Sequence, residues 1–190
     1  GHWQTPWDAA TVDYHEVAIP AQVDALIRRR LAQLAPEERR VLDIAAVLGA
    51  PFDLATLAHF LPDSRRHLLA AATLVRRRFL QETPTAYQFE HDQIRQTVYA
   101  QIEPAQRRDT HRRAGEVLAH LQPDAHTLLA HHFEQAGATG RAFHHQWKAG
   151  EGAQQTGAYR LARTHYAKAV DWLDELPVIN TVRVELLMQW

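Results

Sequence analysis

The segment Tyr87-Gln88-Phe89-Glu90-His91-Asp92-Gln93-Ile94-Arg95 decides the fold of this chain. Its first residues favour an extended strand, and an apolar helical face begins at Ile94 and continues through Val98 and Ile102. We therefore expect a short strand that runs directly into a helix, with His91 and Asp92 at the junction. The backbone N–H groups at the start of a helix favour negative charge, and an imidazole there can offer a further donor to an anion.

The residues just before this segment predict a β-hairpin. Residues 79–83 and 86–90 are short runs with β-forming side chains, and Pro84 lies between them. Three helices followed by a hairpin are typical of a winged helix. In that arrangement the helix at 64–78 takes the place of the recognition helix, and residues 79–90 form the wing.

Apolar spacing predicts the helices upstream of the hairpin. One begins at Pro20 and continues to about Leu34, and the next begins at Pro36 and ends at Gly49, since proline is favoured at the start of a helix and glycine just past its end. Asp53 is expected to cap a short third helix. The side chains that we expect to be buried are Val23, Leu26, Ile27 and Leu31 in the first helix, Val41, Ile44, Ala45 and Leu48 in the second, Leu54, Leu57 and Phe60 in the third, and Leu68, Ala72, Val75 and Phe79 in the helix from 64 onward.

From Pro104 onward the pattern predicts helices only, and a repeat is visible in it. Gly137 and Gly157 stand twenty residues apart, and small residues recur at the same step. Such residues allow paired helices to approach closely, as in helical solenoids. Trp147, Tyr159 and Trp172 are expected to pack between the helices. The recurring positions are Ala142, Gln146 and Ala149, then Ala162, Tyr166 and Ala169, then Val182, Leu186 and Gln189.

The composition is that of a globular protein. The chain has 190 residues with 46% hydrophobic and 23% charged side chains, and no cysteine that could form a disulfide or a thiolate metal site. A formal charge of -1 argues against a strongly basic nucleic-acid binder but leaves room for a local basic face. No apolar run reaches the roughly 18 residues that a membrane span needs. We expect a cytoplasmic protein. We also expect a fragment of a longer protein, because the apolar pattern at 186–190 stops part-way through a helix.

Three segments together resemble the signal-transduction ATPases of the STAND class, which include large LuxR-type bacterial regulators and cyclase- or kinase-linked sensors. The resemblance covers most of the chain from about residue 20 to 175. Glycine and aromatic positions within 150–169 also fit the tetratricopeptide pattern, although its leading Trp and Leu positions do not match. The three segments are 25–31 continuing through 45–49, the F-x-H-D-x-x-R junction at 89–95, and 129–137 with 148–151.

The resemblance implies a regulatory role. In proteins of this class a nucleotide-binding module precedes the winged helix, and the histidine of the His-Asp motif contacts the diphosphate of ADP in the resting state. That role falls on His91, with Asp92 orienting the start of the helix. The chain has no G-x-x-x-x-G-K-[ST] phosphate loop. We therefore expect a non-enzymatic fragment without a cofactor, whose parent protein binds ATP and ADP and whose first partner is the upstream nucleotide-binding module of the same chain.

The arginine runs offer an alternative function. Arg65 and Arg66 stand at the start of the helix at 64–78, and Arg76, Arg77 and Arg78 at its end, where a winged helix that reads DNA would use them. Glu82 and Glu90 on or beside the wing weaken this hypothesis, because they oppose the attraction to phosphates. We favour a solvated or interdomain face and do not expect this fragment to bind nucleic acid.

The histidines do not predict a metal site. The pairs at 131–132 and 144–145 are adjacent in sequence, and neighbouring helical residues point about 100° apart. They therefore cannot chelate an ion as residues four apart do. Ser64 and Thr110 lack any supporting catalytic motif, and Ser64 is expected to cap a helix.

The predicted organisation has three parts. Residues 1–19 form a connector, residues 20–103 a winged-helix domain, and residues 104–190 a tetratricopeptide-like solenoid that is truncated at its C-terminus. The winged helix reads the nucleotide state, and the repeats sense a signal or bind a protein partner. A passive scaffold, in which only the repeats act, is a third hypothesis. No membrane contact is expected.

Overall fold

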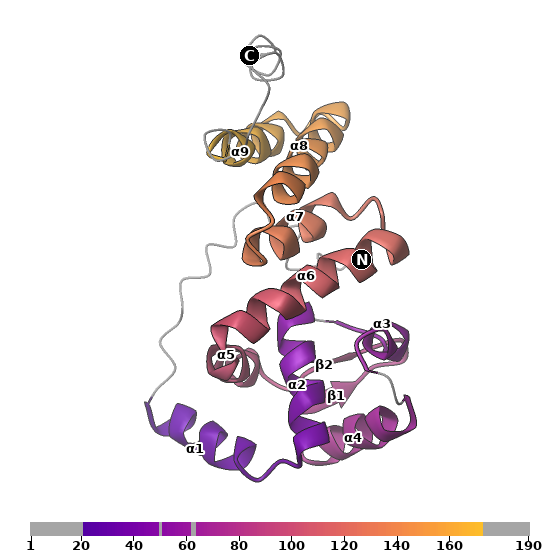
Figure 1. Cartoon of the computed structure of the whole chain (residues 1–190), viewed down its shortest axis with the longest axis vertical. Helices are drawn as coiled ribbons and strands as arrows, with labels where there is room; N and C mark the ends of the chain where they lie inside the picture. Colours follow the sequence, from indigo (N-terminus) through magenta and orange to yellow (C-terminus); the bar gives the residue numbers. More distant parts are fainter. Residues whose placement is uncertain (1–20, 50, 62–63, 173–190) are drawn as a thin grey trace. The chain divides into compact units, whose positions relative to one another are not determined.

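The computed structural model describes residues 21–49, 51–61 and 64–172, and this part of the chain is mainly helical (Figure 1). Contacts divide the chain into two compact units, and the boundary along the sequence falls between Val117 and Leu118, within helix α6 (Pro104–Leu121). The predicted connector at 1–19 and the third copy of the repeat at 182–189 lie outside the described residues.

The first unit contains five helices, a hairpin and most of α6 among its described residues. Two elements fall where the sequence predicted them, since α2 begins at Pro36 and the strands flank residues 83–86. Pro104 likewise begins α6. The bounds are α1 Ala21–Leu31, α2 Pro36–Leu48, α3 Leu54–Ala58, α4 Ser64–Arg76, β1 Leu80–Glu82, β2 Tyr87–Phe89, α5 Asp92–Gln101 and α6 Pro104–Leu121.

Helix α2 is the centre of the first unit. The four side chains predicted to face the core are buried, and Leu42, Ala46 and Val47 on its other sides are buried too. From Val41 to Leu48 every residue of α2 except Asp43 is buried, so this half of the helix lies in the middle of the core. The apolar face of α5 is confirmed as well, because Ile94 and Val98 are both buried in the same cluster as α2.

The hairpin is antiparallel and pairs Leu80 with Phe89 and Glu82 with Tyr87. A third segment joins it, because Phe52 and Tyr87 exchange two backbone hydrogen bonds with N···O distances of 2.9 and 2.7 Å. Arg78 precedes β1 with a φ of 53°, a left-handed conformation that ends the helical path of α4. Phe52 therefore adds a short third strand position beside β2.

The predicted buried face of the helix from residue 64 onward is correct only in part, because Phe79 is buried and Val75 is partly buried, whereas the other two residues are exposed. Leu68 is 51% exposed and Ala72 is exposed, whereas Leu74 is fully buried. The helix instead turns His67, Ala70, Ala71 and Leu74 toward the core. Small alanines permit close packing on α2, and this tertiary fit outweighs the burial of two adjacent leucines.

The predicted apolar face of α1 is correct only in part. Ile27 and Leu31 are buried, but Val23 and Leu26 are exposed. Helix α1 packs mainly on α5, where Thr97 donates a hydrogen bond to Asp24 at 3.0 Å, so only a narrow edge of α1 is covered.

The second unit continues from Leu118 with three further helices in its described part (Figure 1). Two identical turns join them. Ala138 N–H donates to the Phe133 carbonyl and Ala158 N–H to the Ala153 carbonyl, both at 2.8 Å, across Gly137 and Gly157, whose φ values are 69° and 76°. This is the Schellman arrangement, which needs a left-handed residue that glycine adopts without strain. The helices are α7 His126–Gln135, α8 Thr139–Gln155 and α9 Tyr159–Val170.

The packing of α8 and α9 explains two small residues of the repeat. Ala142 and Ala162 are buried at equivalent positions. Gly150 lies against the ring of Tyr166, so close that an added Cβ would stand 2.5 Å from Cε1 of that ring. Trp147 also contacts this ring, with 4.6 Å between its ring centroid and that of Tyr166. Tyr159, which we expected to pack between helices, is 70% exposed instead.

Candidate functional site

His91 is the residue that joins the hairpin to α5. Its backbone is extended (φ -144°, ψ 142°), and its carbonyl accepts the N–H of Ile94 at 3.0 Å. The imidazole makes no capping hydrogen bond, and the residue is exposed. The exposed imidazole of His91 therefore lies beside the first backbone N–H groups of α5.

The N-cap position of α5 is filled by an unusual side chain. Ser, Thr, Asp and Asn are preferred there because their oxygens accept backbone N–H groups, typically worth about 1 kcal/mol relative to alanine. Asp53 does this for α3, where it accepts the Thr56 N–H at 2.6 Å. His91 provides no such bond, so the stability of α5 does not account for its ring.

Asp92 follows at the first position of α5, as predicted. Its carboxylate accepts hydrogen bonds from Arg95 Nε at 2.8 Å and from Gln96 Nε2 at 2.6 Å. An acidic side chain in the first turn is favourable to the helix dipole. Asp92 therefore stabilises the first turn of α5, and Arg95 balances its charge. The neighbouring His91 is exposed to solvent.

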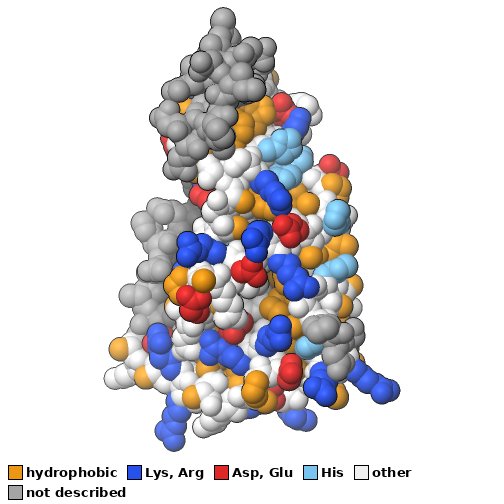
Figure 2. All heavy atoms as spheres, in the orientation of Figure 1, with side chains coloured by type: hydrophobic (Ala, Val, Ile, Leu, Met, Phe, Trp, Pro, Cys, Tyr) orange, Lys and Arg blue, Asp and Glu red, His pale blue; other side chains and the backbone are white. Residues whose placement is uncertain are grey.

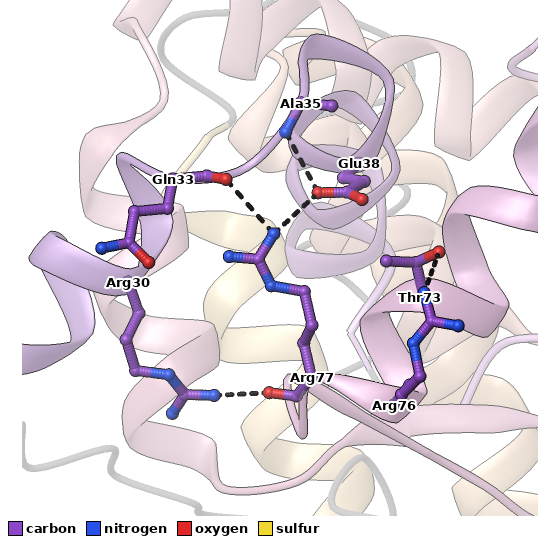
Figure 3. A network of polar contacts seen from close by, with 7 residues as sticks. All are labelled: Arg30, Gln33, Ala35, Glu38, Thr73, Arg76 and Arg77. Carbon is purple, nitrogen blue, oxygen red and sulfur yellow. Dashed lines mark hydrogen bonds and ion pairs between the residues drawn. The ribbon is translucent and has the colours of Figure 1, made fainter.

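Arg77 is partly buried, and its guanidinium is bonded to other residues of the first unit (Figure 3). Its guanidinium donates to the Glu38 carboxylate and to the Gln33 carbonyl, each at 3.2 Å. Glu38 also accepts the N–H of Ala35 at 3.0 Å, which completes the start of α2. Arg30 closes the network by donating to the Arg77 carbonyl at 2.6 Å, with its guanidinium 4.5 Å from the centre of the Phe79 ring.

The other arginines of the predicted contact set lie at the surface. Arg65 and Arg66 are exposed in the first turn of α4, and Arg76 is exposed in its last turn. Arg78 has an 81% exposed side chain and a 3.6 Å ion pair with Glu90. The five arginines therefore do not act as one set of free cations, because Arg77 is bonded to Glu38 and Arg78 is paired with Glu90.

Charges of both signs are mixed on the molecular surface. On the face displayed in Figure 2, Asp and Glu side chains lie among the Lys and Arg side chains, although Lys and Arg predominate toward the lower edge of the view. Such a surface attracts phosphates only weakly, since the attraction depends on several cations acting together.

Two histidines from different helices are in contact in the second unit. The spacing of histidines within a single helix did not predict this contact. His126 Nδ1 of α7 and His145 Nδ1 of α8 lie 3.2 Å apart, so one carries the proton and donates to the other. Burial, followed by the nearby His144, lowers the pKa of His145 to about 4. Burial also lowers the pKa of His126. Both rings are therefore neutral near pH 7.

The same contact recurs twenty residues later. Gln146 Nε2 and His165 Nδ1 lie 3.0 Å apart between α8 and α9, and both side chains are buried. Across the described ranges, no group of three or more His, Asp or Glu side chains is arranged to hold a metal ion. The histidines thus serve as polar links between successive helices. No described helix combines the length and apolar character needed to cross a bilayer.

Comparisons with known proteins add one relative. A protein of Rhizobium meliloti (strain 1021), described only as uncharacterized, is 30% identical over 191 residues, which cover 94% of this chain. The chain spans only 18% of the length of that relative. No family model matches the chain, and no solved structure matches it.

Proposed function

We propose that this chain is the regulatory part of a STAND-type ATPase, in which a winged helix reads the nucleotide held by an upstream module. The winged helix comprises α2, α3, α4 and the hairpin, and the helical repeats that follow bind a protein partner or a signal. The proposal assigns no catalysis to the described residues. ATP and ADP belong to the parent protein.

The architecture of the first unit supports the winged-helix assignment. Helices α2, α3 and α4 precede an antiparallel hairpin, and the pairing of Phe52 with Tyr87 supplies a short third strand position between α2 and α3. In the second unit, the equivalent turns at Gly137 and Gly157 support a tandem helical repeat. The tetratricopeptide assignment rests on this repeat and on the Gly150–Tyr166 packing.

The exposed ring of His91 is the observation that carries the proposal. It lies at a helix start, where backbone N–H groups already favour an anion, and it makes no hydrogen bond that would occupy it there. An imidazole can donate to a phosphate oxygen in its neutral or its charged form. A diphosphate brought by a neighbouring module would therefore meet both kinds of donor.

The proposed switch works through differential affinity. A contact between His91 and ADP stabilises the resting arrangement only to the extent that the active arrangement lacks it. A hydrogen bond to a charged group contributes about 1.5–3 kcal/mol, which corresponds to a population change of roughly tenfold to a hundredfold.

The test is the His91→Ala substitution in the full-length protein. We expect ADP to dissociate about tenfold faster or more and basal output to rise, since one charge-assisted contact is lost. Gln93→Ala is the matched control, because Gln93 is exposed in the same turn of α5. Unchanged ADP retention and unchanged basal output in His91→Ala would exclude the sensor role and leave the scaffold hypothesis.

Direct DNA binding is the second candidate function, favoured by the exposed Arg65 and Arg66. Two observations weigh against it. Arg77 is held by Glu38, and the exposed surface of α4 between its terminal arginines is formed by Leu68, Leu69 and Ala72 rather than by side chains that read base edges.

A further inference from the structure

His126 and His145 bring two imidazole nitrogens together from different helices of the second unit. His126 is the first residue of α7 and His145 lies in α8, and their Nδ1 atoms are 3.2 Å apart. Helices α7 and α8 pack against each other and are joined by the turn at Gly137. The fold of the repeat therefore sets the positions of the two facing atoms, and both rings are half-buried.

The distance between the two nitrogens suits a metal site as well as a hydrogen bond. Two nitrogens that bind one tetrahedral Zn²⁺ at about 2.0–2.1 Å stand roughly 3.3 Å apart. In the metal-free chain one proton lies between the rings, and a metal ion would replace it. Because the rings are half-exposed, a modest rotation of each can direct both lone pairs to one ion while α7 and α8 stay in place.

The rings are also in the protonation state that a metal ion requires. Histidine binds a metal through the lone pair of a neutral imidazole. Burial is the main cause that lowers the pKa of His145 to about 4, and it lowers the pKa of His126 as well. Protons therefore compete little for these nitrogens near neutral pH, and the exposed side of the pair gives water access to the ion.

Charges of both signs surround the pair. Beyond the effect of burial, Asp124 and Glu151 raise the pKa of His126 and so favour a cation, whereas His144 and Lys148 oppose one. The two imidazoles, rather than a local excess of negative charge, therefore provide the affinity.

We propose that His126 and His145 form a two-histidine site for a divalent transition-metal ion such as Zn²⁺ or Ni²⁺, with water in the remaining positions. Imidazole suits these ions, whereas Mg²⁺ and Ca²⁺ prefer oxygen ligands. The ion would link α7 to α8 and stabilise the second unit, because the unfolded chain does not hold the two rings together. Among the described residues no third His, Asp or Glu is arranged to hold the ion, so binding should be reversible. This inference is independent of the role of His91.

The equivalent contact one repeat later does not offer the same site. Gln146 and His165 lie 3.0 Å apart, but the glutamine presents its amide nitrogen, which has no lone pair for a metal. Both side chains are also buried. Of the two contacts, the one between α7 and α8 joins two imidazoles that solvent can reach.

The experiment measures Zn²⁺ binding to the 190-residue chain by isothermal titration calorimetry at neutral pH, with Mg²⁺ as the comparison ion. His126→Gln and His145→Gln each remove one ligand and keep a side chain that can hydrogen bond. Because the chain has 13 histidines, His120→Gln at an exposed position of α6 is the matched control. Thermal unfolding with and without Zn²⁺ measures the link between the helices, and circular dichroism without metal checks that each variant is folded.

We expect one Zn²⁺ per chain to bind and to raise the melting temperature, and Mg²⁺ to do neither. His126→Gln and His145→Gln should each weaken binding at least about tenfold and remove the rise, since losing even an outer partner of a metal ligand typically weakens binding by about 10–100-fold. His120→Gln should leave both measurements unchanged.

Three results would overturn the proposal. The absence of any Zn²⁺-dependent rise in melting temperature would show that the pair is a hydrogen bond alone. Affinity retained in both glutamine variants would assign binding to other histidines, as an adventitious ion only. Affinity lost in one of these variants but not in the other would exclude an ion shared by the two rings.

Discussion

The imidazoles of His126 and His145 share a hydrogen bond with 3.2 Å between their Nδ1 atoms. They connect α7 to α8 in the same way that Gln146 and His165 connect α8 to α9. Each pair is nineteen residues apart, and the second stands twenty residues after the first. The repeat thus reproduces a polar contact between helices as well as a turn, with a titratable group in each copy.

The histidine pair predicts that acid destabilises the second unit. The pKa of His145 is lowered to about 4 from 6.5, so the unfolded chain binds more protons than the folded chain between these values. Stability is therefore present above pH 6.5 and is lost as the pH falls toward 4, by an amount on the order of 1–2 kcal/mol after allowance for partial exposure. The neighbouring charged or titratable groups that act on this pair are Asp124, Arg141, His144, Lys148 and Glu151.

Urea unfolding at about pH 7 and about pH 5 measures this loss. His145→Gln should reduce the difference between the two conditions, because glutamine can keep a hydrogen bond to His126 without titrating. His120→Gln, at an exposed position of α6, is the control and should behave as the unsubstituted chain. An identical pH response in His145→Gln and the unsubstituted chain would contradict the assignment.

Gly150 and Gly152 predict opposite effects of the same substitution. In Gly150→Ala the new methyl group would stand 2.5 Å from the Tyr166 ring, which must move, so we expect a loss of about 1–3 kcal/mol. In Gly152→Ala the methyl group meets nothing within 4 Å, and the helix should gain about 0.5–1 kcal/mol. Chemical denaturation compares the two. If Tyr166→Ala fails to reduce the effect of Gly150→Ala, the close approach of the ring is not its cause.

Arg77 is predicted to contribute stability rather than ligand binding. Arg77→Ala removes its bonds to Glu38 and Gln33 and should lower the free energy of unfolding by about 1–2 kcal/mol. Arg29→Ala, at an exposed position of α1, should change it by less than about 0.5 kcal/mol. A double-mutant cycle with Glu38→Ala should show coupling, and additive effects would mean that the two side chains do not interact.

Replacing His91 at the N-cap of α5 by serine is expected to increase the stability of the first unit. His91→Ser supplies a capping oxygen that the histidine does not, so we expect the first unit to gain about 0.5–1 kcal/mol. Thermal unfolding measures the change. A loss of stability would indicate that the His91 ring makes structural contacts, and the sensor proposal would then lose its main support.

Local chemistry was enough to predict most elements of the first unit. Pro36 and Gly49 bracket α2, Asp53 caps α3, and the apolar face of α5 begins at Ile94 as expected. Each of these features depends on a few neighbouring residues, so the sequence contains the information directly.

Features that depend on tertiary fit could not be predicted in this way. Leu68 and Leu69 offer α4 an apolar face that competes with the face of Ala70 and Ala71, and only the fit against α2 decides between them. The pairing of His126 with His145 joins two helices, so a search for ligands within one helix overlooks it. The twenty-residue repeat could have predicted this contact, because residues at equivalent positions of successive helices make equivalent contacts.

The matching joints at Gly137 and Gly157 have an evolutionary consequence. Because each joint is closed by its own backbone bonds, a duplicated or deleted stretch of twenty residues would leave every remaining joint intact. The number of helices in the repeat can therefore change by whole units during evolution. Each added unit would also carry a copy of the polar contact that links it to its neighbour.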